Sequence, residues 1–375
     1  MLKKADIVLV GHPFAPIGRG EDVRCTYRAL KKVGIQPKVL DLYALQKPEG
    51  PLQRQLASEL TDSTGQVNIF HLNGNEIPQA LAHLQAKGVS GGYNIVCPQW
   101  ELSRYPSEWA TNLELFDEVW APTKFVFDAI SPVVRKPLAL VPLGCQVELS
   151  SILGRRYFGL PESDYTFLFF FDFRSYSQRK NPEAVVESFE KLVQKMPNSK
   201  AALVIKLNGA ELAPAQFNLL QERVKSLGNR VILINRTITD NEIKNLVRCC
   251  DCFVSMHRSE GFGRGLAEAM YLGKPVIATR YSGNLHFMNT NNSFLIDYEL
   301  IDLKEGDYPY WQGQQWADAD TEQTAHYMAS LVSNPSLGYE MGKIAATSVS
   351  QSVGYRATGL NYIERISRLN DQQMQ

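Results

Sequence analysis

Residues 252–270 read CFVSMHRSEGFGRGLAEAM, and this stretch contains a strand, a loop and the start of a helix. Residues 252–255 form a short apolar run of the kind found in buried strands. The loop that follows carries three glycines in five residues, and the chain then takes on a helical pattern at Leu266. A buried strand that leads through a glycine-rich loop into a helix predicts one βα unit of a parallel sheet.

The same alternation of apolar runs and helical stretches extends outward from this unit and occurs twice along the chain. In the first half, the predicted strands are residues 7–10, 38–41, 68–72, 94–97, 118–121 and 138–142. In the second half, they are residues 166–171, 201–206, 231–234, 252–255, 276–278 and 293–296. We therefore predict an α/β protein with two Rossmann-like domains, 1–160 and 161–352, and a C-terminal helix within 353–375 that packs back on the first domain.

Two segments, 43–66 and 303–320, show neither helical nor strand periodicity and are predicted to be loops. The second contains Asp318-Ala319-Asp320, which matches a D-x-D pattern that can chelate a divalent metal. Because Asp320 stands directly before Thr321, Glu322 and Gln323 and an amphipathic run, we expect Asp320 to cap a helix instead. We predict no metal and no other cofactor.

The composition excludes several classes of protein. Lysine plus arginine and aspartate plus glutamate both number 39, so no global charge draws the chain to nucleic acid or anionic lipid. The six cysteines do not form two C-x-x-C motifs, the pair of motifs that many zinc sites require. The cysteines favour a reduced, cytoplasmic setting. The apolar stretch near the N-terminus stops at Gly11, too early for a signal peptide or a membrane span. Peripheral contact with a membrane stays open.

In parallel sheets, ligands bind beyond the carboxyl ends of the strands, where loops and helix N-termini converge. The loop after residue 255 is such a place, because its glycines let the backbone approach a ligand and direct amides at a diphosphate. Glu260 stands in this loop and Glu268 in the following helix. The segment predicted to hold such a diphosphate ligand comprises Glu268, Gly261, Phe262, Gly263, Gly265 and Leu266.

This constellation resembles the retaining glycosyltransferases of family 4 type, which have two Rossmann-like domains facing across a cleft, the glycosyltransferase-B fold. The resemblance covers nearly the whole chain. Its core is two glutamates separated by seven residues, met by Glu260 and Glu268. The resemblance implies that Glu260 lies beside the donor sugar and that Glu268 binds the ribose hydroxyls, a role suited to a carboxylate.

The resemblance also implies a basic pair after the first strand of the C-terminal domain. Arg174 and Lys180 have the matching spacing, and Lys180 precedes a helix that Asn181 and Pro182 are expected to start. Such cations stabilise the departing diphosphate without a metal. The neighbouring Arg179 is interpreted as an ordinary solvated charge. Arg236, after another strand, is expected to border the donor base.

In the N-terminal domain, Gly18 and Gly20 resemble the family's glycine loop, whose backbone approaches the donor phosphate. On the acceptor side, Asn73 aligns with a histidine of the family. His71, just before it, is as consistent with a packed strand residue as with a catalytic one. Glu101 is the better candidate for an acceptor-facing carboxylate. Three tryptophans, Trp100, Trp109 and Trp120, are expected in the core or the wall of the cleft rather than stacked on sugar.

The sequence therefore predicts a metal-independent, retaining glycosyltransferase that moves a sugar from a nucleotide-sugar to a carbohydrate or lipid-linked acceptor, with polysaccharide or glycoconjugate assembly as the default pathway. Two alternatives stay open: a nucleotide-sugar epimerase of the same architecture, and a non-catalytic binding partner that has kept the fold.

Overall fold

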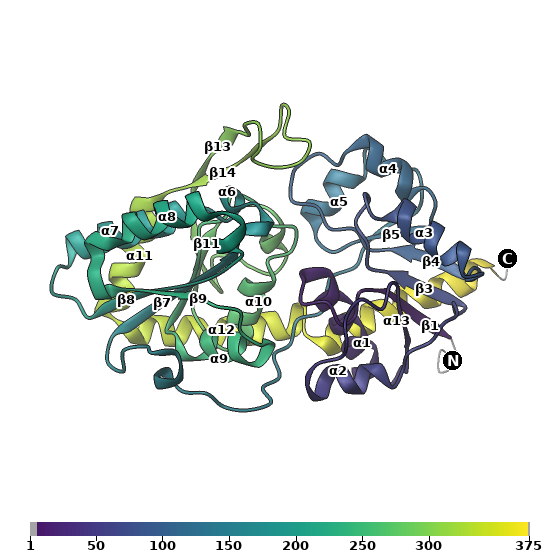
Figure 1. The fold of residues 1–375 in the computed structure, drawn as a ribbon, viewed down its shortest axis with the longest axis horizontal. Helices are drawn as coiled ribbons and strands as arrows, with labels where there is room; N and C mark the ends of the chain where they lie inside the picture. Colours follow the sequence, from purple (N-terminus) through teal and green to yellow (C-terminus); the bar gives the residue numbers. More distant parts are fainter. Residues whose placement is uncertain (1–5, 374–375) are drawn as a thin grey trace. The chain divides into compact units, whose positions relative to one another are not determined.

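The computed structural model describes residues 6–373 and divides into two compact units (Figure 1). Unit 1 comprises Met1–Gln146 with Ser350–Gln375, and unit 2 comprises Val147–Val349. The outermost residues of the predicted domains, 1–5 and 374–375, lie outside the described part. The first unit ends before the predicted boundary at residue 160, because residues 150–153 bind helix α9 (Asp240–Cys249) of unit 2. Asn241 accepts from the amide of Ser150 at 2.9 Å, and Asn245 accepts from the amide of Leu153 at 2.9 Å.

Unit 1 contains a six-stranded parallel sheet in the order β2-β1-β3-β4-β5-β6. The strands are β1 (Ile7–Gly11), β2 (Lys38–Asp41), β3 (Val67–Phe70), β4 (Tyr93–Val96), β5 (Glu118–Ala121) and β6 (Leu138–Leu140). The helices are α1 (Gly18–Lys32), α2 (Gly50–Ala57), α3 (Ile77–Ala86), α4 (Ser107–Leu113), α5 (Lys124–Ile130) and α13 (Tyr355–Gln373). The strand order reverses direction between β1 and β3.

Unit 2 contains a second six-stranded parallel sheet in the order β12-β11-β10-β7-β8-β9. Its strands are β7 (Tyr165–Asp172), β8 (Ala201–Asn208), β9 (Val231–Asn235), β10 (Cys252–Ser255), β11 (Val276–Thr279) and β12 (Phe294–Ile296). Its helices are α6 (Ser177–Lys180), α7 (Pro182–Lys195), α8 (Pro214–Val224), α9 (Asp240–Cys249), α10 (Arg264–Tyr271) and α11 (Thr321–Ser333), and α12 (Pro335–Ser352) leads back toward unit 1. Here the strand order reverses between β7 and β10.

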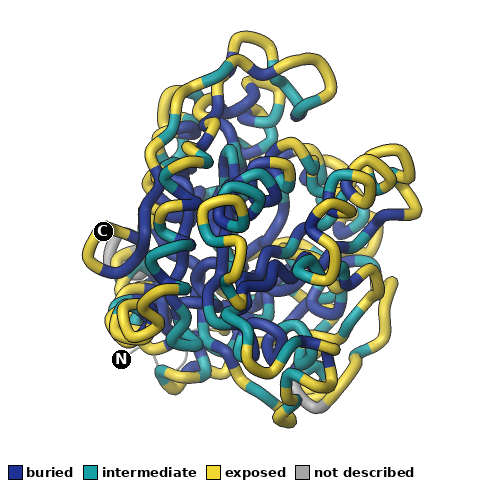
Figure 2. The backbone as a smooth tube through the Cα atoms, turned by 90° about the vertical axis from the view of Figure 1, so that its left-hand side faces the viewer, coloured by how far each residue is buried: buried dark blue, intermediate teal, exposed yellow. Residues whose placement is uncertain are grey.

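The two sheets confirm the predicted α/β fold, and every predicted strand is present within two residues of its expected ends. The prediction succeeds because strands buried on both faces are continuous apolar runs. Figure 2 shows the buried backbone in the interior and the exposed backbone in outer loops. Trp100 and Trp120 are 1% and 2% exposed, so the prediction of a core role for these two is confirmed. Trp109 packs edge-on against Trp100.

Helix α13 completes the core of unit 1, although it lies more than 200 residues after β6 in the chain. The Tyr362 hydroxyl donates to the Pro142 carbonyl at 3.0 Å, and its ring stacks on Trp120 with centroids 5.7 Å apart. Gly359 lies so close to α1 that a Cβ there would be 2.3 Å from the Ala29 carbonyl oxygen. Close packing of α13 on α1 therefore depends on this glycine.

Both segments predicted to be loops contain regular structure. Helix α2 occupies part of 43–66, where its buried Leu56 packs into the core of unit 1. In the other segment, β14 (Gln315–Ala319) pairs antiparallel with β13 (Tyr298–Asp302). These predictions were wrong because α2 is short and because the hairpin loop is long and lacks the two-residue turn that marks hairpins in sequence.

Candidate functional site

The switch point of the unit 2 sheet brings two loops together at the carboxyl ends of β7 and β10. The β7 loop passes through Asp172 and Arg174 into the short helix α6, and Asn181 then caps α7, with its side chain accepting from the Ala184 amide at 3.4 Å. The start of α7 at Asn181 and Pro182 is as predicted. The β10 loop runs to Gly263, the residue before α10. Adjacent strands whose connections leave in opposite directions form a crevice for ligands at this point.

Glu260 of the β10 loop meets two cations of α6. Its Oε1 accepts from the Lys180 ammonium, and its Oε2 lies 3.3 Å from Nη1 of Arg179. The Glu260 side chain is 12% exposed. Burial alone would raise the pKa of Glu260, but the charges of Lys180 and Arg179 outweigh burial and lower this pKa to about 2. Glu260 is therefore ionised at neutral pH.

The interpretation of Arg179 as a solvated charge was wrong. Arg179 is 4% exposed, and its guanidinium donates to the Ser259 carbonyl at 2.8 Å and to the Ser175 carbonyl at 3.3 Å. Its own carbonyl accepts from the Arg258 amide at 2.8 Å. The sequence could not show this, because residue type alone does not distinguish a buried arginine from its exposed neighbour.

A segment that the sequence analysis missed holds the backbone of Glu260. The Glu260 amide donates to the Ser282 hydroxyl at 2.8 Å, and the Gly283 amide donates to the Glu260 carbonyl at 2.8 Å. A Cβ on Gly283 would be 2.0 Å from the Gly261 carbonyl oxygen, so only glycine fits. The available signal was the Ser-Gly pair after β11, which marks a turn but not what the turn touches.

His257 is fully buried behind this loop. Its Nδ1 lies 3.0 Å from the Ser255 hydroxyl, and its Nε2 lies 3.1 Å from Oδ1 of Asn284 and 3.3 Å from the Tyr281 carbonyl. Two acceptors at Nε2 place the proton there, so Nδ1 accepts from Ser255. Burial lowers the pKa of His257. The ring is a neutral brace between β10 and the segment after β11.

The predicted donor segment follows Glu260 into α10. Gly263 has a φ of +89°, and a Cβ on Gly265 would be 2.6 Å from the Phe170 ring, so both glycines are required by conformation or packing. Phe262 and Leu266 are buried, at 5% and 2% exposed, and belong to the core. Glu268 lies on α10, partly buried.

The other predicted donor residues of unit 2 lie on neighbouring loops of the same sheet edge. Arg174 pairs with Asp172 rather than with Glu260, at 2.6 Å, and its side chain is 56% exposed. Arg236 follows β9, pairs with Glu242 at 3.1 Å and is half exposed. Between them, the buried Lys206 of β8 donates to Asn208 at 2.6 Å, and burial lowers its pKa to about 8. Sequence reasoning missed Lys206. The available signal was a charged residue within an otherwise apolar run.

In unit 1, Gly18 and Gly20 stand at the start of α1 and differ in their surroundings. A Cβ on Gly18 would meet nothing within 4 Å, whereas a Cβ on Gly20 would be 2.3 Å from the Ala15 carbonyl oxygen. Arg19 between them pairs with Glu76 at 2.8 Å, beyond the end of β3. The amide of Asn73 donates to Glu76 at 2.9 Å. These residues meet near the switch point of the unit 1 sheet.

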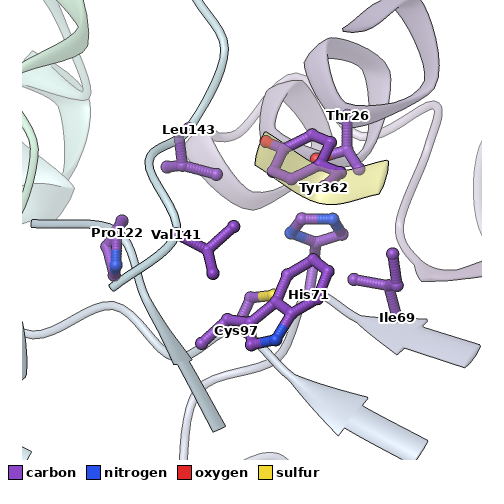
Figure 3. A pocket seen from close by; sticks show the side chains of 9 residues that line it. Thr26, Ile69, His71, Cys97, Pro122, Val141, Leu143 and Tyr362 are labelled. Carbon is purple, nitrogen blue, oxygen red and sulfur yellow. The ribbon is translucent and has the colours of Figure 1, made fainter. Parts of the chain in front are cut away.

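The other acceptor-side candidates lie after β3 and β4. Oδ1 of Asn73 accepts from the Gln99 amide at 3.1 Å, which ties the two loops together. Glu101 is partly exposed on the second loop. His71 is 2% exposed and lines a small apolar cavity with Cys97 and Tyr362 (Figure 3). The structure thus places His71 in the interior of unit 1.

The two aspartates of the D-x-D pattern have structural partners. Asp320 caps α11 as predicted, accepting from the amides of Glu322 and Gln323 at 2.8 and 3.0 Å. Asp318 lies 3.1 Å from the guanidinium of Arg258. Among residues 6–373, no group of three or more His, Cys, Asp or Glu side chains has the arrangement of a metal site.

Similar solved structures identify the fold. HepE of Anabaena in complex with UDP-glucose superposes with a TM-score of 0.68 at 14% identity, over 97% of this chain and all of HepE. Sucrose-phosphate synthase from Thermosynechococcus elongatus gives 0.68 at 16%, over 98% of this chain and all of the synthase. A glycosyltransferase from Rickettsia africae gives 0.68 at 15%, over 96% and 97%. This is the glycosyltransferase-B fold.

A family model matches part of the unit that carries Glu260. Residues 157–302 match the family model of Glycosyl transferases group 1. Mannosylfructose-phosphate synthase of Agrobacterium fabrum is 30% identical over 109 residues, which span 28% of this chain and 23% of the synthase. The segment typical of group 1 glycosyltransferases is therefore present in unit 2. No helix of residues 6–373 combines the length and apolarity needed to cross a membrane.

Within the glycosyltransferase-B fold, this crevice combines an ionised carboxylate, a lysine beside it and a glycine-rich turn before a helix. A carboxylate and an ammonium at one point can bind sugar hydroxyls and stabilise a departing anion. This arrangement therefore suits a reaction in which a sugar is transferred and an anion departs.

Proposed function

We propose that the chain is a retaining glycosyltransferase that uses a nucleotide-diphosphate sugar as donor. The observation that carries the proposal is the contact of Glu260 with Lys180 at the switch point of unit 2, inside the segment that matches group 1 glycosyltransferases. In this proposal, Glu260 contacts the donor sugar and Lys180 the diphosphate. No side chain is assigned as a covalent nucleophile.

The donor nucleotide is proposed to lie along the loops of unit 2. Glu268 accepts from the ribose hydroxyls, and the backbone between Gly261 and Gly265 approaches the diphosphate. Arg174 is half exposed beside Asp172, and its guanidinium can reorient toward a phosphate. Because HepE binds UDP-glucose in its structure, UDP-sugars are the first donors to test.

We further propose that the leaving group is stabilised by Lys180 and Arg174 without a metal, at roughly 1.5–3 kcal/mol per charged hydrogen bond. Activity is then expected to persist in excess chelator. Turnover measured with and without EDTA tests this point. Complete loss in EDTA, restored by Mg²⁺ or Mn²⁺, would overturn it.

The test of function is incubation of the full chain with UDP- and GDP-sugars and a panel of acceptors, with release of nucleoside diphosphate as readout. The panel includes sugar phosphates, because two relatives are synthases of phosphorylated disaccharides by name, and glycan and lipid-linked acceptors. NMR of the product anomer tests retention. Interconversion of donor epimers without acceptor would instead identify an epimerase, and tight binding without turnover a binding partner.

A further inference from the structure

The two cations that meet Glu260 are held in different ways. Arg179 is 5% exposed in its side chain and Lys180 is 21% exposed, although they are adjacent in α6. Arg179 also bonds two backbone carbonyls, those of Ser259 and Ser175. Lys180 reaches Glu260 through a flexible four-carbon stem with a single terminal ammonium.

The anchoring of Arg179 links the two loops of the crevice. Its guanidinium bonds the carbonyl of Ser259, directly before Glu260, and its carbonyl accepts from Arg258 on the same loop. Arg258 in turn donates to the Gln178 carbonyl at 3.0 Å and pairs with Asp318 of β14. The guanidinium of Arg179 is therefore fixed relative to Glu260 by several bonds.

When the Lys180 ammonium turns toward the donor diphosphate, its contact with Glu260 is weakened or lost. A buried carboxylate that loses its counter-ion is strongly destabilised, because neither water nor another charge replaces it. A second cation that stays in place removes this obstacle.

We propose that Arg179 is a positioning residue that remains with Glu260 as its permanent counter-ion, while Lys180 exchanges between Glu260 and the donor diphosphate. This inference rests on the proposed function. It assigns Arg179 to catalysis only through Glu260, since the guanidinium contacts this carboxylate and the carbonyl of Ser259 directly before it.

Among the described residues, the charged or titratable side chains that most lower the pKa of Glu260 are Lys180 and Arg179 from α6 and His257 from the β10 loop. Removal of Arg179 leaves one mobile cation, so the pKa of Glu260 rises from its lowered value. In the pH range where Glu260 then protonates, activity falls. The acid limb of the activity profile is therefore expected to move to higher pH.

The first experiment compares Arg179→Met, Arg179→Lys and the control Arg156→Met, whose side chain is 90% exposed in the same unit. For Arg179→Met, we expect kcat to fall by about tenfold to hundredfold, nucleoside diphosphate affinity to change by less than about threefold, and the acid limb to shift upward. Arg179→Lys restores part of kcat and of the acid limb. Arg156→Met behaves like wild type.

A double variant keeps the inference testable if Arg179→Met folds poorly. Glu260→Gln is neutral and needs no counter-ion, so Arg179→Met with Glu260→Gln is expected to fold and to be no less active than Glu260→Gln alone. If the double variant instead loses activity by the product of the two single-variant factors, Arg179 acts independently of Glu260 and the inference is overturned. A wild-type chain without turnover would instead refute the proposed function.

Discussion

At the residue scale, the two glutamates of the donor segment are predicted to act at different stages. Glu268→Ala should raise the dissociation constant of the nucleoside diphosphate by about tenfold to hundredfold, because a charged hydrogen bond to ribose is lost. Glu260→Ala should mainly lower kcat, because its contact is to the reacting sugar. Calorimetry and steady-state kinetics on both variants measure this. Wild-type nucleotide affinity in Glu268→Ala would remove the ribose assignment.

The basic pair gives a second residue-scale prediction. Arg174→Ala and Lys180→Ala should each lower turnover by about tens to thousands of fold, because each cation stabilises charge that develops on the leaving diphosphate. Lys195→Ala is the matched control, since Lys195 is nearly half exposed on α7 and pairs with Glu322. Steady-state turnover and thermal melting are compared for all three. A similar loss in the control would indicate general dependence on positive charge.

Side-chain burial is where sequence and structure diverge most. The resemblance to family 4 glycosyltransferases brought Lys180 and Glu260 into one hypothesis, and the structure places them in contact. It did not distinguish Arg179 from a surface arginine, because burial is decided by the β10 loop, which lies some 80 residues further along the chain. The bracing role of Ser282 was missed for the same reason.

At the element scale, strands were predicted more accurately than the hairpin. Strands such as β10 are short apolar runs between turn signals, and their pattern is local. The pairing of β13 with β14 joins residues separated by a long loop. It is accompanied by burial of Trp316 and by stacking of Arg258 over the Trp316 ring at 5.5 Å. Such long-range contacts produce no hydrophobic periodicity in the sequence from which the hairpin could be predicted.

The start of α1 provides a prediction at this scale. Gly20→Ala should destabilise unit 1 by about 1–3 kcal/mol, because the added Cβ has no room beside the Ala15 carbonyl. Gly18→Ala should leave folding intact or slightly stabilised, because its site is open and alanine favours the helix. Urea unfolding measures both.

Activity then separates two roles for Gly18. If its backbone approaches the donor phosphate, Gly18→Ala lowers turnover in a fully folded chain. Unchanged turnover would exclude a close approach at this residue. The comparison with Gly20→Ala shows how much loss comes from folding alone.

At the scale of the whole molecule, unit 1 is assembled from the two ends of the chain. All strands of its sheet precede residue 141, but Glu118 at the buried start of β5 is bound by a residue of α13. Glu118 is fully buried, and its Oε1 accepts from Nε of Arg365 on α13 and from the indole of Trp120, each at 2.6 Å. Closing this contact requires residues 247 positions apart to meet, which makes unit 1 dependent on the last helix.

Arg365→Met is therefore expected to destabilise unit 1 by about 3–5 kcal/mol, because it leaves the carboxylate of Glu118 buried without its cation. Arg368→Met is the matched control: it lies three residues further along the same helix, is 63% exposed and pairs with Glu364. Its effect should stay within about 0.5 kcal/mol. Hydrogen exchange resolved by peptide measures both variants and should show lost protection in β5 and α1, with the strands of unit 2 unchanged. Equal protection in the two variants would mean that the contact with Glu118 does not hold α13 in place, and that the stacking of Tyr362 on Trp120 suffices.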